Sequence, residues 1–432
     1  MSAPMVTRHA DEILLITRIR TLNKGNQALS AAWLALLERA FPGAPIRILE
    51  RRPRHLIQYT LRQLAAERDP VATFDRIVDD LARHAPGPDA IEPPAAAPAI
   101  LLDETISPPA RFVRARQRLN LRGRLARVGF YEAAFRRRLA AFQRAALVVV
   151  NPAGEFFPRE PQAALYHLFD AAIAKALGRP TAIVNHTMDI TDPTLRRIIP
   201  ALYRRLDLIG FRDTKSVGAF TEMGGDARNV IVTPDLALTI EPPRGRARRA
   251  GVVGLAINVP EATAGGYLEQ WVDVIRGLRG AGLEVVLVSN ELPADQPFYV
   301  RLQARFPGLA IEGAGLDHER YAVLLSSFEV VISSRMHTAI LAMTAGTPVV
   351  PVEGSSFKIT GLFRELGFLE PVVRPGEATW VDEIVRRTTH ARASRREVSV
   401  ATLARITAAR DAIIAGLLPP LRAAAQAPGG TP

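Results

Sequence analysis

The stretch FEVVISSRMHTAILAMTAGTPVVPV, residues 328–352, holds the pattern that decides the fold. An apolar run ends at Ile332, polar residues follow, a helical pattern runs from Ser334 to Ala345, and a second apolar run comes next. Strand, turn, helix and strand in this order form the unit of a parallel sheet that is covered by helices. We therefore predict a Rossmann-like domain around this stretch.

The same alternation extends toward the N-terminus in two series. The later series has predicted strands at Gly251–Ile257, Glu284–Ser289, Phe328–Ser333 and Pro348–Val352. The earlier series has predicted strands at Glu12–Thr17, Ile46–Leu49, Ala99–Leu102, Ala146–Val150, Thr181–Val184, Leu206–Phe211 and Val230–Val232. Helical patterns separate most of these strands, which favours two doubly wound sheets.

A segment rich in proline and arginine, residues 241–250, divides the two series and is typical of a linker. We predict an α/β protein with two Rossmann-like domains in a GT-B-like arrangement and a deep interlobe cleft. The domains are residues 10–240 and 251–390, and residues 391–432 form a closing helix and tail. Two domains also suit a chain of 432 residues, which exceeds the usual size of one core.

Residues 53–144 depart from this rhythm and predict a helical, arginine-rich insertion. Its part from Arg111 to Arg144 contains eleven arginines and a single acid, Glu132. This pattern fits either a solvated helical face or a platform for a lipid-linked or phosphorylated acceptor at an anionic membrane. Nucleic acid is not expected, because a recognisable binding motif is missing and few aromatic residues are interleaved.

The amino-acid composition excludes several kinds of site and favours anionic ligands. The chain has no cysteine, which excludes disulfides, thiolate nucleophiles and metal sites built on sulfur. A formal net charge of +12 predicts attraction to anions such as phosphorylated metabolites. The apolar runs are too short for a signal peptide or a membrane span, so we expect a cytoplasmic protein, at most at the inner face of the membrane.

The sharpest candidate site is Ser333-Ser334-Arg335-Met336-His337-Thr338, where a predicted strand meets a predicted helix. A helix N-terminus attracts anions through its unpaired N–H groups. Arg335 adds a fork that suits a carboxylate or a phosphate, and His337 adds a group that titrates near neutrality. Alternatively, Arg335 pairs with a structural carboxylate and His337 caps the helix.

At this point the sequence resembles the polysaccharide pyruvyl transferase family. The stretch Ser333–Phe368 is similar to the C-terminal signature of that family, with Arg, a hydrophobic residue and His opening a helix and Lys before Gly-Leu. Four earlier pieces fit in order: TLNKGNQAL (21–29), NPAGEFF (151–157), FRDTKS (211–216) and TPDL (233–236). The resemblance covers most of the chain from Thr21 to Phe368.

The resemblance implies a metal-independent reaction of phosphoenolpyruvate with two sugar hydroxyls, which gives a cyclic ketal and releases phosphate. The acceptor would be a sugar of a glycan or of a lipid-linked precursor. Phosphoenolpyruvate carries two anionic groups on a short skeleton, so its site needs several fixed cations. The candidates are Arg335, Arg212 and Lys358, together with Gly154, which lets a ligand approach the backbone closely.

Proton transfer in such a reaction needs a general acid and a base. We expect His337 and His186 in these roles, because each follows a predicted strand at the edge where α/β proteins bind ligands. By the same rule Arg335, His337, His186 and Arg212 should converge on one cleft. A satisfied core histidine at 186 and an Arg212–Asp213 ion pair are the structural alternatives.

Five further residues are candidates for the cleft or the acceptor. Asn23, Gly25 and Asn26 precede a helix, and Asn26 is expected to cap it. Glu155 either accepts a proton from the acceptor or faces solvent in a turn, and Asp235 is either a base or an Asx turn. In the family Gly-Asp usually stands where this chain has Gly25-Asn26, and the loop around Gly154 usually has more glycines.

Two other functions stay open. One is a GT-B glycosyltransferase that uses a nucleotide sugar, because a fold does not determine its function. The other is a non-catalytic binder of anionic glycans. Dispersed histidines and the missing GxxxxGK[ST] motif argue against a metal site and a P-loop, so we expect no required cofactor or metal.

Overall fold

The computed structural model describes residues 12–18, 21–50, 59–86, 100–102, 135–158, 161–241, 247–258, 266–354 and 356–427. Much of the predicted insertion 53–144 lies outside these residues. Within it the structure has α2 (Leu61–Ala65), α3 (Pro70–Ala82), β3 (Ile100–Leu102) and a helix over residues 135–144. Of the arginine-rich stretch only this last helix is described.

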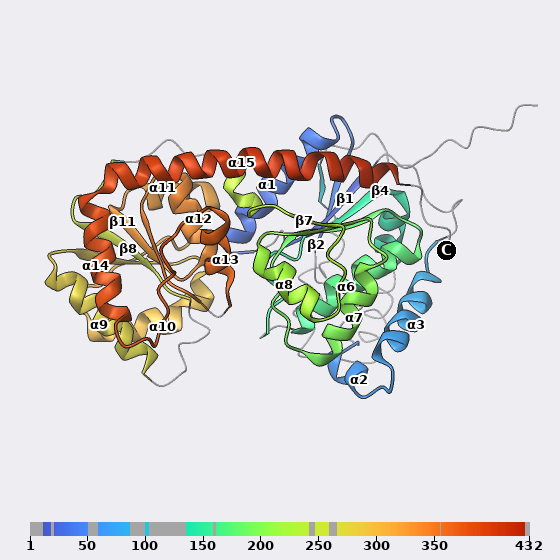
Figure 1. Cartoon of the computed structure of the whole chain (residues 1–432), viewed down its shortest axis with the longest axis horizontal. Helices are drawn as coiled ribbons and strands as arrows, with labels where there is room; N and C mark the ends of the chain where they lie inside the picture. The colour runs from blue at the N-terminus through green and yellow to red at the C-terminus, as the bar shows by residue number, and fades with distance from the viewer. Residues whose placement is uncertain are drawn as a thin grey trace, which may run out of the picture.

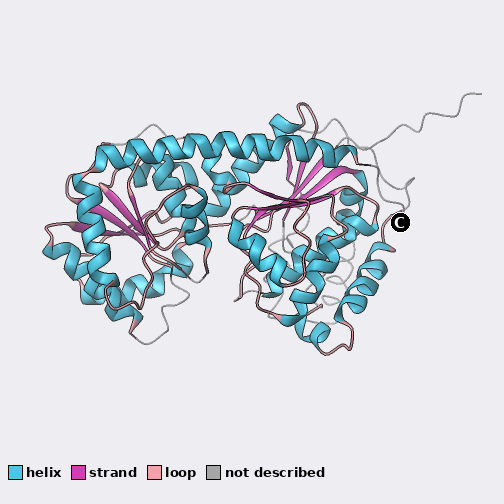
Figure 2. Ribbon diagram, in the orientation of Figure 1, coloured by secondary structure: helices cyan, strands magenta, loops and turns pink. Residues whose placement is uncertain are grey.

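The first lobe surrounds a seven-stranded parallel sheet in the order β3-β2-β1-β4-β5-β6-β7. Its strands are nearly continuous apolar runs, as expected for a sheet that helices cover on both faces (Figure 2). The remaining elements of this lobe are β1 (Glu12–Thr17), α1 (Lys24–Ala40), β2 (Ile46–Glu50), β4 (Ala145–Val150), α6 (Pro161–Ala176), β5 (Thr181–His186), α7 (Pro193–Tyr203), β6 (Leu208–Phe211), α8 (Thr214–Glu222), β7 (Val230–Val232) and η5 (Leu236–Thr239).

The second lobe surrounds a five-stranded parallel sheet in the order β10-β9-β8-β11-β12. Its elements are β8 (Val252–Ala256), α9 (Tyr267–Gly280), β9 (Glu284–Val288), α10 (Leu292–Arg305), β10 (Ile311–Glu312), α11 (His318–Ser326), β11 (Val330–Ser333), α12 (Met336–Thr344), β12 (Val349–Pro351), α13 (Lys358–Glu365) and α14 (Trp380–Ala393). The predicted α/β class with two Rossmann-like domains in a GT-B-like arrangement is confirmed, and a cavity lies between the lobes.

One long helix, α15 (Arg395–Gln426), runs along both lobes (Figure 1). It is longer than the helix predicted near residues 400–418 and continues through Pro419 and Pro420. Its buried residues Ile413 and Leu417 share a core with Leu29 of α1 and Ile340 of α12. The two prolines have no N–H to donate, and the burial of apolar side chains against both lobes offsets the loss of these hydrogen bonds.

No helix among the described residues is both long and apolar enough to cross a membrane.

Candidate functional site

A cavity of about 240 Å³ lies between the lobes, at the edge where the strands of both sheets end. In each sheet the chain reverses its direction of winding at one pair of strands, β1 and β4 in the first and β8 and β11 in the second. Ligands of open α/β sheets bind at such switch points. Residues directly after these four strands line the cavity, among them Arg18, Gly154, Asn258 and Arg335.

Arg212 forms part of the cavity wall from the first lobe. Its guanidinium donates from Nε to the hydroxyl of Thr187 (2.7 Å) and from Nη1 to Oδ2 of Asp235 (2.9 Å). Asp235 is thus its carboxylate partner, whereas Asp213 caps α8. The third nitrogen, Nη2, is buried and has no hydrogen-bond partner among the described residues. A buried guanidinium with unused donor capacity suits an anionic ligand.

Lys358 reaches the same wall from the second lobe. Its Nζ donates to the carbonyl of Gly154 at 2.7 Å and lies 4.2 Å from the centre of the Phe157 ring. A Cβ at Gly154 would be 3.0 Å from this Nζ and 3.6 Å from Nη2 of Arg212. The glycine therefore lets two cations approach one point of the backbone, whereas close approach of a ligand to Gly154 stays a prediction.

Arg335 lines the cavity and also has a carboxylate partner. Its guanidinium forms an ion pair with Asp295 of α10 and donates from Nε to the carbonyl of Ile257 at 3.3 Å. Asp295 is fully buried and accepts from the hydroxyl of Ser289 (3.1 Å) and the N–H of Glu291 (2.9 Å). This pairing fixes the orientation of Arg335, whose side chain stays 16% exposed toward the cavity.

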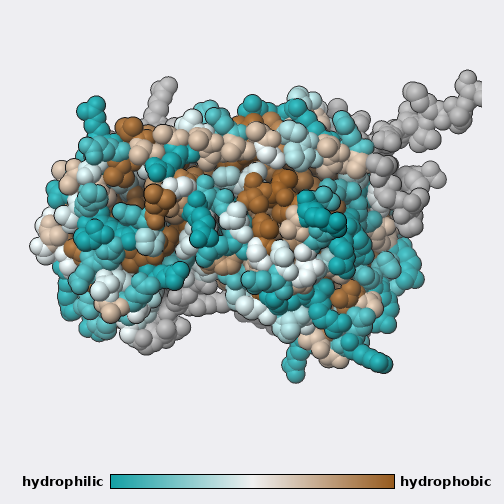
Figure 3. All heavy atoms as spheres, in the orientation of Figure 1, coloured by the Kyte–Doolittle hydropathy of each residue, from teal (hydrophilic) through white to brown (hydrophobic). Residues whose placement is uncertain are grey.

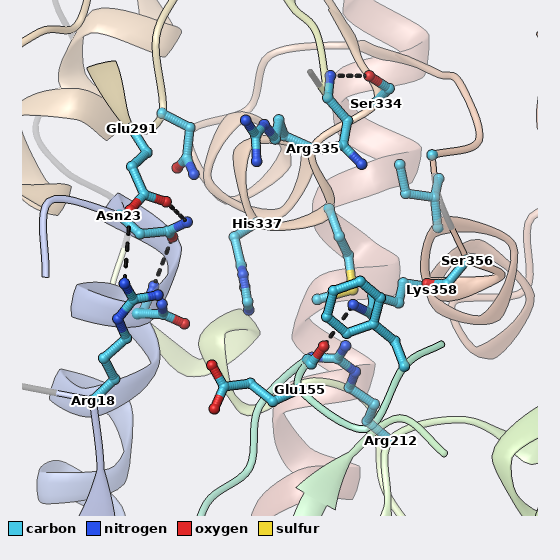
Figure 4. A pocket seen from close by; sticks show the side chains of 18 residues that line it. Arg18, Asn23, Glu155, Arg212, Glu291, Ser334, Arg335, His337, Ser356 and Lys358 are labelled. Atoms are coloured by element: carbon cyan, nitrogen blue, oxygen red, sulfur yellow. Dashed lines mark hydrogen bonds and ion pairs between the residues drawn. The ribbon is translucent and has the colours of Figure 1, made fainter. Parts of the chain in front are cut away.

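His337 stands in the first turn of α12, opposite Arg212 and Glu155 of the first lobe (Figure 4). Its Nε2 lies 3.6 Å from Oδ2 of Asp235. A Cβ at Gly25 would come within 2.4 Å of the imidazole, so the ring packs directly on the backbone of the first loop. His337 does not cap the helix; Arg335 occupies that position, without a side-chain hydrogen bond.

Asp235 therefore connects the two lobes. Burial alone would raise the pKa of this carboxyl, but His337, Arg212 and the N–H of Ala237 hold the pKa at about 2. Its Oδ1 accepts from that N–H at 2.9 Å, which is the Asx-type turn that we predicted, while Oδ2 faces the two cations. A carboxylate with both functions joins the turn of the first lobe to His337 of the second lobe.

Asn185 holds the turn that carries Asp235. Its amide donates to the carbonyl of Pro234 at 3.0 Å and accepts from the N–H of Leu236 at 2.9 Å. The backbone of Asn185 has a φ of 58°, in the left-handed region that asparagine tolerates better than most residues. The side chain thus bonds the peptide groups on both sides of Asp235.

The prediction that His186 faces the cleft is wrong. Its side chain is fully buried between Phe156 and Phe211, and Nε2 lies 3.0 Å from the hydroxyl of Tyr203. Burial, followed by the nearby charges of Arg212 and His167, lowers the pKa of His186 to about 3. A neutral histidine in the core cannot reach a ligand in the cavity.

The described geometry also corrects the expectations for the first and second loops. Asn23 rather than Asn26 caps α1, because Oδ1 of Asn23 accepts from the N–H of Asn26 at 3.2 Å. Both asparagines line the cavity. Glu155 does not face solvent: it is 8% exposed, lines the cavity and lies 3.0 Å from Nε2 of the buried His167.

Several residues of the site were absent from the predicted set. Asn258, Asn290 and Glu291 line the cavity, and Asp295 positions Arg335 from behind. The sequence could have indicated Asn258, Asn290 and Glu291, because they come shortly after the strands β8 and β9. Ligands of parallel α/β sheets bind at the ends of such strands. Among the described residues no group of three or more His, Cys, Asp or Glu could hold a metal ion.

Two Rossmann-like lobes around a cationic cavity define a two-domain α/β protein with a candidate anion-binding site between its lobes. The sequence model of the polysaccharide pyruvyl transferase family matches residues 23–356, and the chain belongs to this family. It is therefore a transferase of the kind that modifies polysaccharides.

Several solved structures have a similar course of the chain. HepE of Anabaena, in complex with UDP and glucose, is 15% identical, with 95% of this chain and 97% of that chain covered and a TM-score of 0.49. UGT71G1 of Medicago truncatula with UDP-glucose is 12% identical (96% and 99% covered, TM-score 0.49), and a glycosyltransferase of Rickettsia africae is 11% identical (96% and 96%, TM-score 0.48). No curated protein matches this chain.

Proposed function

We propose that this enzyme transfers the pyruvyl group of phosphoenolpyruvate to two hydroxyls of one sugar in a glycan or a lipid-linked precursor. The observation that carries the proposal is the cluster of Arg212, Arg335 and Lys358 around one cavity that also holds the pair His337 and Asp235. A donor with a carboxylate and a phosphate needs such cations close together. Membership of the family supports the same reaction.

The cations come from both lobes, so the donor would bridge them. Arg212 and Lys358 flank Gly154 on one side of the cavity, and Arg335 belongs to the wall of the second lobe. In this arrangement one anionic group of phosphoenolpyruvate binds between Arg212 and Lys358 and the other binds Arg335. Nη2 of Arg212 supplies a donor that no group of the described residues uses.

The chemistry transfers one proton to carbon and forms two C–O bonds. The methylene carbon of the donor takes a proton, the neighbouring carbon bonds the oxygen of the first hydroxyl, and the second hydroxyl oxygen displaces phosphate. One of the two hydroxyl protons ends on the new methyl group and the other on phosphate. His337 is the proposed proton carrier, because its ring borders the cavity and its Nε2 lies 3.6 Å from the carboxylate of Asp235.

Glu155 is the second candidate for proton transfer. It lines the cavity on the side of the first lobe, where an acceptor hydroxyl would approach, and the buried His167 holds its carboxylate at 3.0 Å. In the proposed reaction Glu155 accepts the proton of the hydroxyl while His337 protonates the donor. The amide side chains of Asn23, Asn26, Asn258 and Asn290 offer hydrogen bonds to further hydroxyls of the sugar.

A release assay tests the proposal against the two other functions. The purified enzyme is incubated with a library of sugar acceptors and either phosphoenolpyruvate or a nucleotide sugar. Release of phosphate from phosphoenolpyruvate, unchanged after chelation of metal ions, is the expected result. Release of a nucleoside diphosphate would identify a glycosyltransferase instead. Binding of phosphoenolpyruvate or glycan in a calorimeter without any release would identify a non-catalytic binder.

A further inference from the structure

Two adjoining surface cavities lie outside the cleft. The larger, of about 340 Å³, lies among α13, α14 and α15, and the smaller, of about 290 Å³, lies beside α8 and α13. The segment Phe368–Glu370 and Phe363 line both. The two cavities therefore form one composite surface, which we call the α13 surface.

The larger cavity is lined mainly by apolar side chains. They come from β12, α13, α14 and α15 and include Val349, Pro351, Phe363, Ala391 and Val398. Arg405 also lines this cavity, and its guanidinium lies 4.8 Å from the centre of the Phe368 ring. Such a cavity has the chemistry that an acyl chain requires.

The smaller cavity is cationic. Lys215 of α8, Arg364 and Arg374 line it, and none of the three has an ion-pair partner among the residues that the structure describes. Glu370 is the one acid in the lining of both cavities, and it already faces Arg387 at 3.7 Å. The unpaired cations make this side complementary to an anion such as a phosphate.

Leu369 projects between the cavities into solvent. Its side chain is 97% exposed, more than any other large hydrophobic residue in the described part of the chain. In Figure 3 an apolar patch with hydrophilic side chains around it lies between α13 and α14, below α15. An exposed leucine next to an apolar cavity and a row of cations is unfavourable in water and favourable at a lipid interface.

We propose that the α13 surface docks the enzyme on an anionic phospholipid bilayer. Leu369 enters the interface, the apolar cavity receives an acyl chain, and Lys215, Arg364 and Arg374 contact phosphate groups. Helix α13 then links the membrane with the cleft, because its first residues Lys358 and Ile359 line the cleft. Eight helical residues span about 12 Å, so the cleft would lie close to the headgroups.

Sedimentation with vesicles tests this proposal without donor or acceptor. The full chain is mixed with vesicles of phosphatidylcholine alone or of phosphatidylcholine with phosphatidylglycerol. We expect pelleting with the anionic vesicles, and at least tenfold weaker binding for the triple variant Leu369→Ser, Arg364→Glu, Arg374→Glu, since each basic residue near a membrane contributes roughly fivefold. Equal binding of both vesicle types would overturn the proposal.

A matched control is available on α10, where Val300 is 50% exposed and Arg301 is its exposed neighbour. Val300→Ser with Arg301→Glu should leave vesicle binding unchanged. If the triple variant of the α13 surface pellets as well as the wild type, another region, such as the arginine-rich stretch 111–144, binds the membrane and our assignment is wrong. Phosphate release in the absence of vesicles is measured separately, so a failure here does not affect the proposed reaction.

Discussion

His186 is the last residue of β5 and His337 lies shortly after β11, so both are at the carboxyl end of a strand, yet their surroundings are opposite. His337 borders the cavity beside the ionised Asp235 and packs on the backbone of Gly25 from the other lobe. His186 is sealed in the first lobe, where burial keeps it neutral with a pKa of about 3. Only a histidine with a charged partner and a cavity can exchange protons with a ligand.

Two buried arginine–aspartate pairs give the same lesson. Arg138 and Asp170 form a bidentate pair inside the first lobe, with Nε to Oδ1 at 3.0 Å and Nη2 to Oδ2 at 2.5 Å. Arg212 uses Nη1 for Asp235, while its Nη2 has no partner among the described residues and the carboxylate also faces His337. A buried arginine–aspartate pair thus indicates a binding site only when the arginine lines a cavity and keeps an N–H group that can donate to a ligand.

The largest expected effect separates the two histidines. His337→Asn should lower kcat about 10²- to 10⁴-fold, because a positioned proton carrier is lost. His186→Asn should retain kcat within a few-fold and lower the free energy of unfolding, because Tyr203 loses its partner. Single-turnover phosphate release and denaturant unfolding measure the two quantities. Equal loss of kcat in both variants would remove the distinction.

The next effect concerns the donor. Arg335→Ala should weaken binding of phosphoenolpyruvate by about 1.5–3 kcal/mol, the value of a charge-assisted hydrogen bond. Arg335→Lys should not restore turnover, because an ammonium cannot form a bidentate contact. Calorimetric titration and phosphate release report the two effects, and Arg276→Ala, in an exposed pair with Asp273, serves as control. Near-normal turnover of Arg335→Lys would mean that only the charge matters.

Asn185 offers a test of the turn that carries Asp235. Asn185→Gly keeps the left-handed backbone but removes both hydrogen bonds, and it should lower the free energy of unfolding by about 1–3 kcal/mol. If the turn positions His337, the pH profile of kcat should change as well. A normal pH profile in Asn185→Gly would leave Asn185 with a structural role only.

A further effect is a pH dependence of stability. The pKa of His186 is about 3 in the folded protein, against an ordinary value of 6.5, so the unfolded chain takes up this proton first. Above pH 6.5 the neutral His186 makes its full contribution to the free energy of unfolding. This contribution is lost as the pH falls toward 3, by at most about 1.4 kcal/mol per pH unit. The free energies of unfolding of the wild type and of His186→Asn should therefore converge as the pH falls. A difference between them that does not change with pH would contradict a buried neutral histidine.

The rule that ligands bind where parallel strands end was sufficient to find Arg212, Arg335 and His337 in the sequence, because it uses only the order of strands and helices. Lys358 was found through the family resemblance instead. The rule failed at His186 for a local reason. Side chains of a strand alternate between faces, so His186 should share the face of Val184. The left-handed Asn185 and the shift of register between Ile183 and His186 reverse that alternation.

Other features depend on contacts between distant segments. The sequence does not show that Asp295 pairs with Arg335, that His167 holds Glu155, or that Lys358 reaches the carbonyl of Gly154. The first two contacts join distant segments of one lobe, and the third arises only when the two lobes pack on each other. Local patterns predict the strand ends of each lobe, whereas the partner of each charge is determined by tertiary structure.

The most direct test of the proposed reaction is the mass of its product. The wild type, His186→Asn and His337→Asn are incubated with a library of glycan acceptors and either phosphoenolpyruvate or a nucleotide sugar, and each acceptor is examined by mass spectrometry. We predict that one acceptor gains a pyruvylidene unit with the wild type and with His186→Asn, and that this product falls at least about 100-fold with His337→Asn. An acceptor that gains a glycosyl unit from a nucleotide sugar, while phosphoenolpyruvate yields no product, would contradict pyruvyl transfer.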